Sequence, residues 1–222
     1  GGTSEAIDSV RSITNHSTGR LGKTITESLL ADGHEVCLIT TKRALKPESH
    51  PNLIIRVINN TNELLLEIQE RVKDYQVLIH SMAVSDYTPV YMTGLEEVKA
   101  SSNLEEFLSK QNHQTKISST DDVQVLFLKK TPKIISLVKE WNPAIHLIGF
   151  KLLVDVNEDH LVDIARKSLI KNQADLIIAN DLTQISADQH RAIFVEKEQL
   201  QTTQTKEEIA ELLLEKIQAY HS

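Results

Sequence analysis

The sequence predicts a single α/β domain over residues 1–222, with a mostly parallel, Rossmann-like sheet covered by helices on both faces. Apolar runs alternate with amphipathic helical segments along most of the chain, as in βαβ units. Residues 76–82 (QVLIHSM) contain the continuous apolar run Val77-Leu78-Ile79, which is typical of a strand buried on both faces of a parallel sheet. Glycines gather ahead of the first helical segment, where ligands bind in such folds.

The predicted elements follow one another in a regular order. Helical periodicity and capping signals predict helices at residues 21–32, 62–73, 131–141, 158–172 and 205–220. Apolar runs predict strands at residues 35–40, 53–58, 76–82, 123–128, 145–152 and 175–179, and a hairpin of residues 191–195 and 200–203. Residues 83–120 are polar and weakly periodic, with room for a helix at 95–110, so we expect a flexible flap over residues 90–120.

Composition and charge argue against several classes of protein. The formal net charge is −7 and no run of Lys or Arg exceeds two residues, which disfavours a nucleic-acid partner. No apolar stretch approaches the roughly 18 residues of a membrane span, and no signal-peptide pattern is present, so we expect a cytoplasmic protein without membrane contact. Cys37 lies in an apolar run, as a buried structural thiol does, and the scattered histidines predict no zinc site.

The first 22 residues hold four of the seven glycines, Gly1, Gly2, Gly19 and Gly22. Glycines let backbone N–H groups approach a phosphate, and the helix that follows adds partial positive charge at its N-terminus. Glycine turns of this kind normally follow a strand, so we expect a first sheet strand upstream of Gly1. The segment therefore predicts a phosphate-binding turn.

A nicotinamide-dependent reductase is one alternative, but its usual motifs are absent. The two glycine pairs are separated by 16 residues, so G-x-G-x-x-G is missing, and no tyrosine has a lysine four positions later. A non-catalytic nucleotide-binding module with the same sheet is a second alternative.

Longer motifs point to a family. The opening reads Gly1-Gly2-Thr3-Ser4-Glu5, then Ile7-Asp8, Val10-Arg11, Ile13, Asn15, Ser17 and Gly19. This pattern closely resembles the signature of phosphopantothenoylcysteine synthetase. The resemblance continues in residues 83–87, 116–117, 129–132, 149–150 and 179–181, and residues 83–120 resemble streptococcal and enterococcal members. We therefore expect the monofunctional bacterial form of this enzyme.

The resemblance implies a ligase of coenzyme A biosynthesis. A nucleoside triphosphate would activate the carboxylate of 4'-phosphopantothenate as an acyl-nucleotide, releasing pyrophosphate. The amine of L-cysteine would then displace the nucleoside monophosphate. CTP is the expected nucleotide, with ATP as the alternative, and family members are homodimers. Mg²⁺ would be held mainly by phosphates and water, and Asp86 is the one candidate protein ligand.

The resemblance also assigns residues. Arg11, Asn15 and Lys116 are the expected catalytic residues, and Asn15 would donate to the developing oxyanion. Arg11, Asn15, Met82 and Ala83 would bind substrate. The expected nucleotide-binding residues are Gly1, Gly2, Ser17, Gly19, Gly22, Asp86, Lys116, Phe150, Lys167, Lys171 and Asn180. Structural alternatives remain, with Asn15 as a capping amide, Asp86 as a turn residue and the lysines as a solvated surface.

The chain departs from the family at three points. Met82-Ala83 replaces a pair of alanines, which changes the expected shape of the pantothenate pocket. The family's Lys-Ile-Lys-Lys stretch reads Lys116-Ile117-Ser118-Ser119. Leu153 replaces a glutamate common in bacterial members, and Gly149-Phe150-Lys151-Leu152 resembles members that use ATP.

Overall fold

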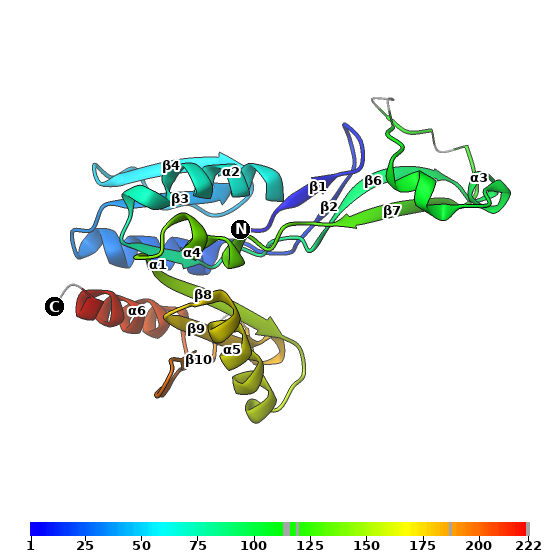
Figure 1. Cartoon of the computed structure of the whole chain (residues 1–222). Helices are drawn as coiled ribbons and strands as arrows, with labels where there is room; N and C mark the ends of the chain where they lie inside the picture. The colour runs from blue at the N-terminus through cyan, green and yellow to red at the C-terminus, as the bar shows by residue number, and fades with distance from the viewer. Residues whose placement is uncertain (113–115, 119, 187, 221–222) are drawn as a thin grey trace.

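The computed structural model describes residues 1–112, 116–118, 120–186 and 188–220. Its centre is a five-stranded sheet in the order β11–β10–β9–β8–β5 (Figure 1). The strands are β5 (Val77–His80), β8 (His146–Leu153), β9 (Leu176–Asp181), β10 (Ala192–Val195) and β11 (Leu200–Thr203). The first three run parallel, whereas β10 and β11 form the predicted hairpin and pair antiparallel. The predicted α/β class with a mostly parallel sheet is confirmed.

Helices cover both faces of this sheet. On one face, α2 (Thr61–Arg71), α4 (Val138–Trp141) and α5 (Glu158–Asn172) contribute Leu64, Val138 and Leu161 to a buried apolar cluster. On the other, α1 (Arg20–Ala31) and α6 (Lys206–Tyr220) contribute to a second cluster around Phe194. No helix in the described part of the chain is long and apolar enough to cross a membrane.

A separate parallel pair, β3 (Val36–Thr41) and β4 (Leu53–Ile58), lies beside β5 but does not join it. The sequence predicts that β5 is buried on both faces and that Cys37 on β3 is buried. Both expectations are wrong, because β5 and Cys37 are only half-buried. The edges of β3 and β5 that face each other carry no ladder of backbone hydrogen bonds.

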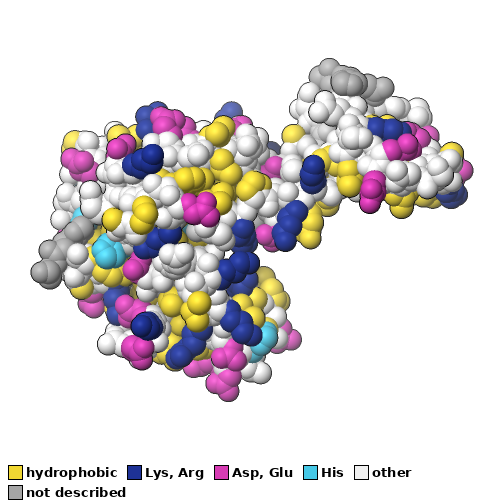
Figure 2. All heavy atoms as spheres, viewed as in Figure 1, with side chains coloured by type: hydrophobic (Ala, Val, Ile, Leu, Met, Phe, Trp, Pro, Cys, Tyr) yellow, Lys and Arg dark blue, Asp and Glu magenta, His cyan; other side chains and the backbone are white. Residues whose placement is uncertain are grey.

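A long arm projects from the body (Figures 1 and 2). It consists of the antiparallel strands β6 (Tyr87–Gly94) and β7 (Gln124–Lys130), with α3 (Leu95–Ala100) and the 3₁₀ turn η2 (Leu104–Leu108) between them. The arm has its own small core, in which Phe107 is fully buried between Tyr91 and Phe127. Strand β6 is absent from the sequence prediction. The predicted flap includes residues 113–115 and 119, which lie outside the described residues.

Two further elements differ from the prediction. The helix predicted at residues 131–141 begins later, as a 3₁₀ turn η3 (Ile134–Ser136) followed by α4. Thr131 instead bonds back to the loop after β5, since its N–H donates to the carbonyl of Asp86 and its hydroxyl to the carbonyl of Ser85. The 3₁₀ turns η1 (Val72–Asp74) and η4 (Leu182–Gln184) extend α2 and β9.

A short hairpin also connects the N-terminus to α1. Strands β1 (Ser4–Ala6) and β2 (Ser12–Thr14) pair antiparallel and lie against the base of β6. Glu5 is buried, and its carboxylate accepts hydrogen bonds from the N–H (2.8 Å) and hydroxyl (2.6 Å) of Thr61 at the start of α2. These two bonds fix the hairpin to the body.

Candidate active site

The glycines of the opening segment meet at the entrance to α1. Gly19 is the N-cap of α1, and its φ of 76° lies in the left-handed region that favours glycine. A Cβ on Gly19 would lie 3.3 Å from the nitrogen of Gly1, and a Cβ on Gly1 would lie 2.6 Å from Oγ1 of Thr41. Gly22 is on the first turn of α1, and a Cβ there would lie 3.9 Å from Oγ of Ser81. Three of the predicted residues, Gly1, Gly19 and Gly22, thus gather at the ends of β3 and β5.

Gly2 places the chain against Asn15. A Cβ on Gly2 would lie 2.3 Å from the carbonyl oxygen of Asn15, so only glycine fits. The side-chain amide of Asn15 donates to the carbonyl of Ala83 (3.2 Å) and to Oγ of Ser85 (3.1 Å). Buried Thr3 accepts a hydrogen bond from the N–H of Ser85 at its hydroxyl. These bonds hold Asn15 against Ala83, whereas the side chain of Met82 packs against the apolar cluster beside β5. The substrate-binding role of Asn15, Met82 and Ala83 stays a prediction.

The amide of Asn15 already uses both of its donors in this conformation. Donation to an oxyanion therefore requires one of these two bonds to be exchanged. The bond to Ser85 Oγ is the easier one to exchange, because the hydroxyl can rotate while the Ala83 carbonyl is fixed by the backbone bonds of Gly1 and Thr3.

Arg11 lies in an ion pair with Asp8. Its Nε and Nη2 donate to Oδ2 of Asp8 at 3.0 and 2.6 Å, and Nη2 also donates to the carbonyl of Ile117 at 3.0 Å. The same carboxylate oxygen accepts from the N–H of Ile117. The hydrogen bonds from Arg11, joined by those from backbone N–H groups, hold the pKa of Asp8 well below its usual range. Asp8 and Arg11 thus form a clasp that binds the backbone of Ile117, in the segment of the chain that precedes β7.

The clasp holds Lys116 near Arg11, since Lys116 directly precedes Ile117. Its side chain is exposed. Among the described residues no hydrogen bond uses Nη1 of Arg11, so both of its N–H groups are left for a ligand. Two of the predicted catalytic cations, Arg11 and Lys116, therefore lie close together although 105 positions apart in the sequence.

The loop after β5 carries further charged groups. Asp86 is exposed and lies 3.3 Å from Nζ of Lys133. Lys129, Lys130 and Lys133 are all exposed along the end of β7 and the segment after it. Figure 2 shows Lys and Arg side chains gathered where the arm meets the body. This region is locally basic in a chain whose net charge is −7, which suits polyanionic ligands.

The remaining predicted residues are dispersed. Phe150 is half-buried on β8, and Asn180 is buried on β9, where its amide donates to the carbonyl of Arg191. Ser17 is exposed in the loop before Gly19. Lys167 and Lys171 are exposed toward the C-terminal end of α5, and no contact within the described chain joins them to the glycine turn. Their nucleotide-binding role stays a prediction.

The described residues contain no cluster of three His, Cys, Asp or Glu side chains that would hold a metal ion. Of the carboxylates near the glycine turn, Asp8 is committed to Arg11, whereas Asp86 is open to solvent. A role of Asp86 beside a phosphate-bound Mg²⁺ stays a prediction.

Several residues of the site are not assigned a role by the sequence. Asp8, Thr3 and Ser85 all lie inside the quoted motifs, and Asp8 stands three positions before Arg11, a spacing that suits an ion pair. Asp181 follows β9 and accepts hydrogen bonds from the N–H groups of Val156 and Asp155. The bond from Val156, followed by those from the hydroxyl and N–H of Thr183 and from the N–H of Asp155, lowers the pKa of Asp181 to about 2.

Comparisons with known proteins agree with the sequence resemblance. The family described as the DNA/pantothenate metabolism flavoprotein C-terminal domain matches residues 1–106 and 98–220. The chain is 31% identical over 220 residues to the coenzyme A biosynthesis bifunctional protein CoaBC of Thermococcus kodakarensis, covering 98% of this chain and 49% of that protein. It is 29% identical to the protein of the same name from Methanocaldococcus jannaschii, covering 98% and 48%. The chain thus spans about half the length of these relatives.

Among solved structures, the DNA/pantothenate metabolism flavoprotein from Streptococcus pneumoniae is 90% identical, with a TM-score of 0.96 over 100% of this chain and 96% of that one. The C-terminal domain of a CoaBC protein is 24% identical with a TM-score of 0.72, over 99% of this chain and 91% of that one, which shows the same fold. By its family match over nearly the whole length and its 31% identity to a curated relative, the chain belongs to the DNA/pantothenate metabolism flavoprotein C-terminal domain family.

Proposed function

We propose that the chain joins L-cysteine to 4'-phosphopantothenate through an acyl-nucleotide, as a ligase of coenzyme A biosynthesis. One observation carries the proposal: the glycine turn meets the Asn15–Ala83 contact at the ends of β3 and β5, and the β1–β2 hairpin leads from there to the contact of Arg11 with Ile117, next to Lys116. This combination suits two polyanions and an acyl group held between them. The curated relatives named for coenzyme A biosynthesis support the same reaction.

Each part of the site suits one task. The glycine turn and the N-terminus of α1 offer backbone N–H groups to phosphates. Nη1 of Arg11 is the guanidinium edge left for a carboxylate or phosphate oxygen, and the flexible ammonium of Lys116 neutralises developing charge on the triphosphate. Asn15 orients the Ala83 carbonyl and donates to the acyl oxyanion after exchanging its bond to Ser85.

The nucleotide is CTP in this proposal, with ATP as the alternative, and Mg²⁺ accompanies it on the phosphates. CTP is preferred because the sequence resembles the bacterial members of the family. We also propose a homodimer in the cytoplasm. The hairpin of β1 and β2 leaves Val10 and Ile13 exposed, which gives a second copy an apolar surface to cover.

The experiment measures pyrophosphate release from CTP and from ATP in parallel, with and without 4'-phosphopantothenate. We expect release that requires phosphopantothenate, and formation of the cysteine amide when L-cysteine is added. Lys116→Gln should slow pyrophosphate release strongly, whereas Lys99→Gln, an exposed lysine of the same arm paired with Glu96, should not. Release independent of phosphopantothenate, or no release with either nucleotide, would reject the ligase.

A further inference from the structure

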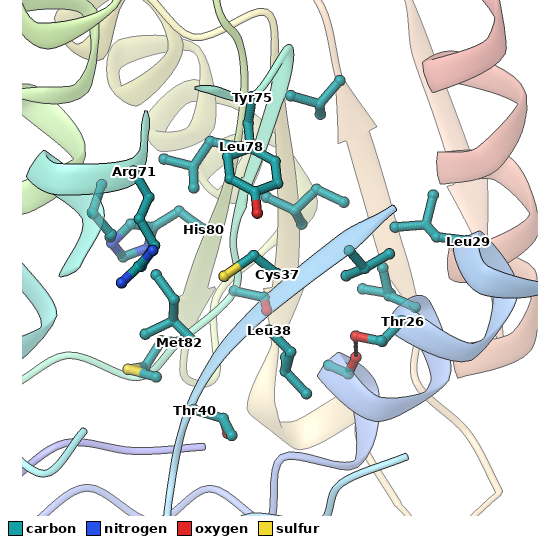
Figure 3. Close-up of a pocket in the computed structure, with 18 of the residues that line it drawn as sticks. Thr26, Leu29, Cys37, Leu38, Thr40, Arg71, Tyr75, Leu78, His80 and Met82 are labelled. Atoms are coloured by element: carbon teal, nitrogen blue, oxygen red, sulfur yellow. Dashed lines mark hydrogen bonds between the residues drawn. The ribbon is translucent and has the colours of Figure 1, made fainter. Parts of the chain in front are cut away.

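The backbone of the loop after β3 is gathered around a single side chain. Residues 42–46 form this β3 loop, which follows Thr40 and Thr41 at the carboxyl end of β3 (Figure 3). The ammonium of Lys46 donates to three backbone carbonyls, those of Thr41 (3.0 Å), Lys42 (2.9 Å) and Ala44 (2.9 Å). An ammonium has three N–H donors, so all three are used. Lys46 therefore has no free donor for a ligand, and its charge acts on the loop.

The glycine turn rests on the β3 loop. The N–H of Leu45 donates to the carbonyl of Thr18 at 2.9 Å. Ala44 is buried, and a Cβ on Gly19 would lie 2.8 Å from the Cβ of Ala44 and 3.4 Å from its Cα. Gly19 thus lies directly on Ala44, the residue whose carbonyl Lys46 holds. A change in the shape of the β3 loop must therefore reach Thr18 and Gly19.

Gly19 in turn sets the start of α1. As the N-cap it has no side chain to accept from the first N–H groups of the helix, and the first turn carries no acidic residue. The N–H groups of a first turn have no partner within their helix, and the proposed function assigns those of α1 to phosphates. Because their direction follows the backbone at Gly19, a displaced Gly19 would turn them away from the phosphates.

We propose that Lys46 is a positioning residue for the triphosphate: by holding three carbonyls together, it keeps the β3 loop in the shape that supports the glycine turn. This inference rests on the proposed function, in which that turn binds the phosphates of the nucleotide. Without the ammonium, three carbonyl dipoles point at one place with no donor between them, so the loop opens to water. The loss should then weaken phosphate binding without acting on the acyl group at Asn15.

Limited proteolysis measures the loop directly. Lys46→Met removes the ammonium but keeps most of the aliphatic stem, and Lys42→Met removes the same charge from an exposed position of the same loop. Arg43 is exposed and present in every variant, so cleavage after Arg43 by an arginine-specific protease, relative to the unfolded chain, reports how far the loop opens. We expect cleavage about tenfold faster in Lys46→Met and no such increase in Lys42→Met. A Lys46→Met loop cleaved at the wild-type rate would overturn the proposal.

Calorimetry with inorganic tripolyphosphate and Mg²⁺ measures the phosphate site without the reaction. Lys46→Met should bind this probe about tenfold more weakly than the wild type, and Lys42→Met less than about threefold more weakly. In the pyrophosphate assay, Lys46→Met should raise KM for the nucleotide about tenfold, with kcat and the KM for L-cysteine changed less than about threefold. Equal losses of affinity in the two variants would mean that charge alone matters, and a lower kcat at unchanged KM would mean that the turn is not the affected group. Either result would overturn the proposal.

The inference and the proposed function fail in different ways. A wild type that binds tripolyphosphate but releases no pyrophosphate would reject the ligase, whereas the cleavage and binding of Lys46→Met would still decide the role of Lys46. A wild type that binds no tripolyphosphate would reject the phosphate site and the role of Lys46 with it. Lys46→Gln, which keeps two N–H donors on a shorter side chain, serves if Lys46→Met does not fold. It should give smaller changes in the same directions, and faster cleavage with unaltered tripolyphosphate binding would contradict the coupling between loop and turn.

Discussion

The contact between Gly2 and Asn15 gives a sharp test of the site. A Cβ on Gly2 would lie 2.3 Å from the carbonyl oxygen of Asn15, whereas carbon and oxygen atoms normally stay beyond about 3.4 Å. The Asn15 backbone would have to move by about 1 Å. Its amide bonds to Ala83 and Ser85, at 3.2 and 3.1 Å, would then exceed hydrogen-bonding distance. Gly2→Ala should therefore damage both stability and the substrate pocket.

The expected cost is that of overpacking a fixed backbone, about 1–3 kcal/mol. For a chain of this size that lowers Tm by about 2–12 °C. Gly22→Ala is the matched control, because its Cβ meets nothing closer than 3.9 Å and lies within a helix. Alanine there should raise stability by about 0.5–1 kcal/mol. Thermal unfolding of both variants by circular dichroism decides the matter. A Gly2→Ala variant as stable as the wild type would refute the close contact.

Three further substitutions test the site and its supports. Asn15→Asp should retain substrate binding but lower turnover about 10²–10³-fold, because a carboxylate repels an oxyanion, and steady-state kinetics will show it. Asp8→Asn should release Ile117 and increase protease cleavage in the segment around it, before β7, as measured by limited proteolysis. Asp181→Asn should reduce Tm at neutral pH. The pKa of Asp181 is about 2 when folded and 3.8 unfolded, so its contribution is complete above about pH 4 and is lost as the pH falls toward 2.

Each substitution has a matched control. Asn103→Asp makes the same change from an amide to a carboxylate at the N-cap of η2, where both residues serve equally, and should keep full turnover. Asp86→Asn removes only an exposed ion pair and should leave arm cleavage unchanged. Asp163→Asn, on the exposed face of α5, should show no change of Tm between pH 7 and 2 beyond that of the wild type. An Asp181→Asn deficit that persists at pH 2 would contradict the carboxylate's role, and unaltered proteolysis of Asp8→Asn would contradict the clasp.

Sequence periodicity predicts the body of the fold well. The predicted helix at 158–172 and strand at 53–58 coincide with α5 and β4, because apolar spacing and capping residues there agree with the tertiary packing. Strand β6 is missed because Pro89 and a register shift after it break the alternation, and its pairing depends on β7, which is distant in sequence. The helix start at residue 131 is missed because Thr131 bonds back to the loop after β5.

The site divides in the same way. The sequence predicts that Gly1, Gly19 and Gly22 belong to one turn, and their local positions around α1 bring them together. It does not predict that Arg11 spends two donor groups on Asp8 and Ile117, because Ile117 reaches it only through the folding of the whole arm. Local motifs show which functional groups are present. A partner that is distant in sequence, such as Ile117 for Arg11, depends on the tertiary structure.

The clasp also determines how the arm is mounted. The arm joins the body at its root, where Thr131 bonds to Ser85 and Asp86, and again where Asp8 and Arg11 hold Ile117. Because the arm is attached at two separate places, it resists both twisting and bending relative to the body. Any motion that swings it would have to carry the β1–β2 hairpin along. In the proposed reaction, the substrate contact at Asn15 and the nucleotide contact at Lys116 would then change together in one movement.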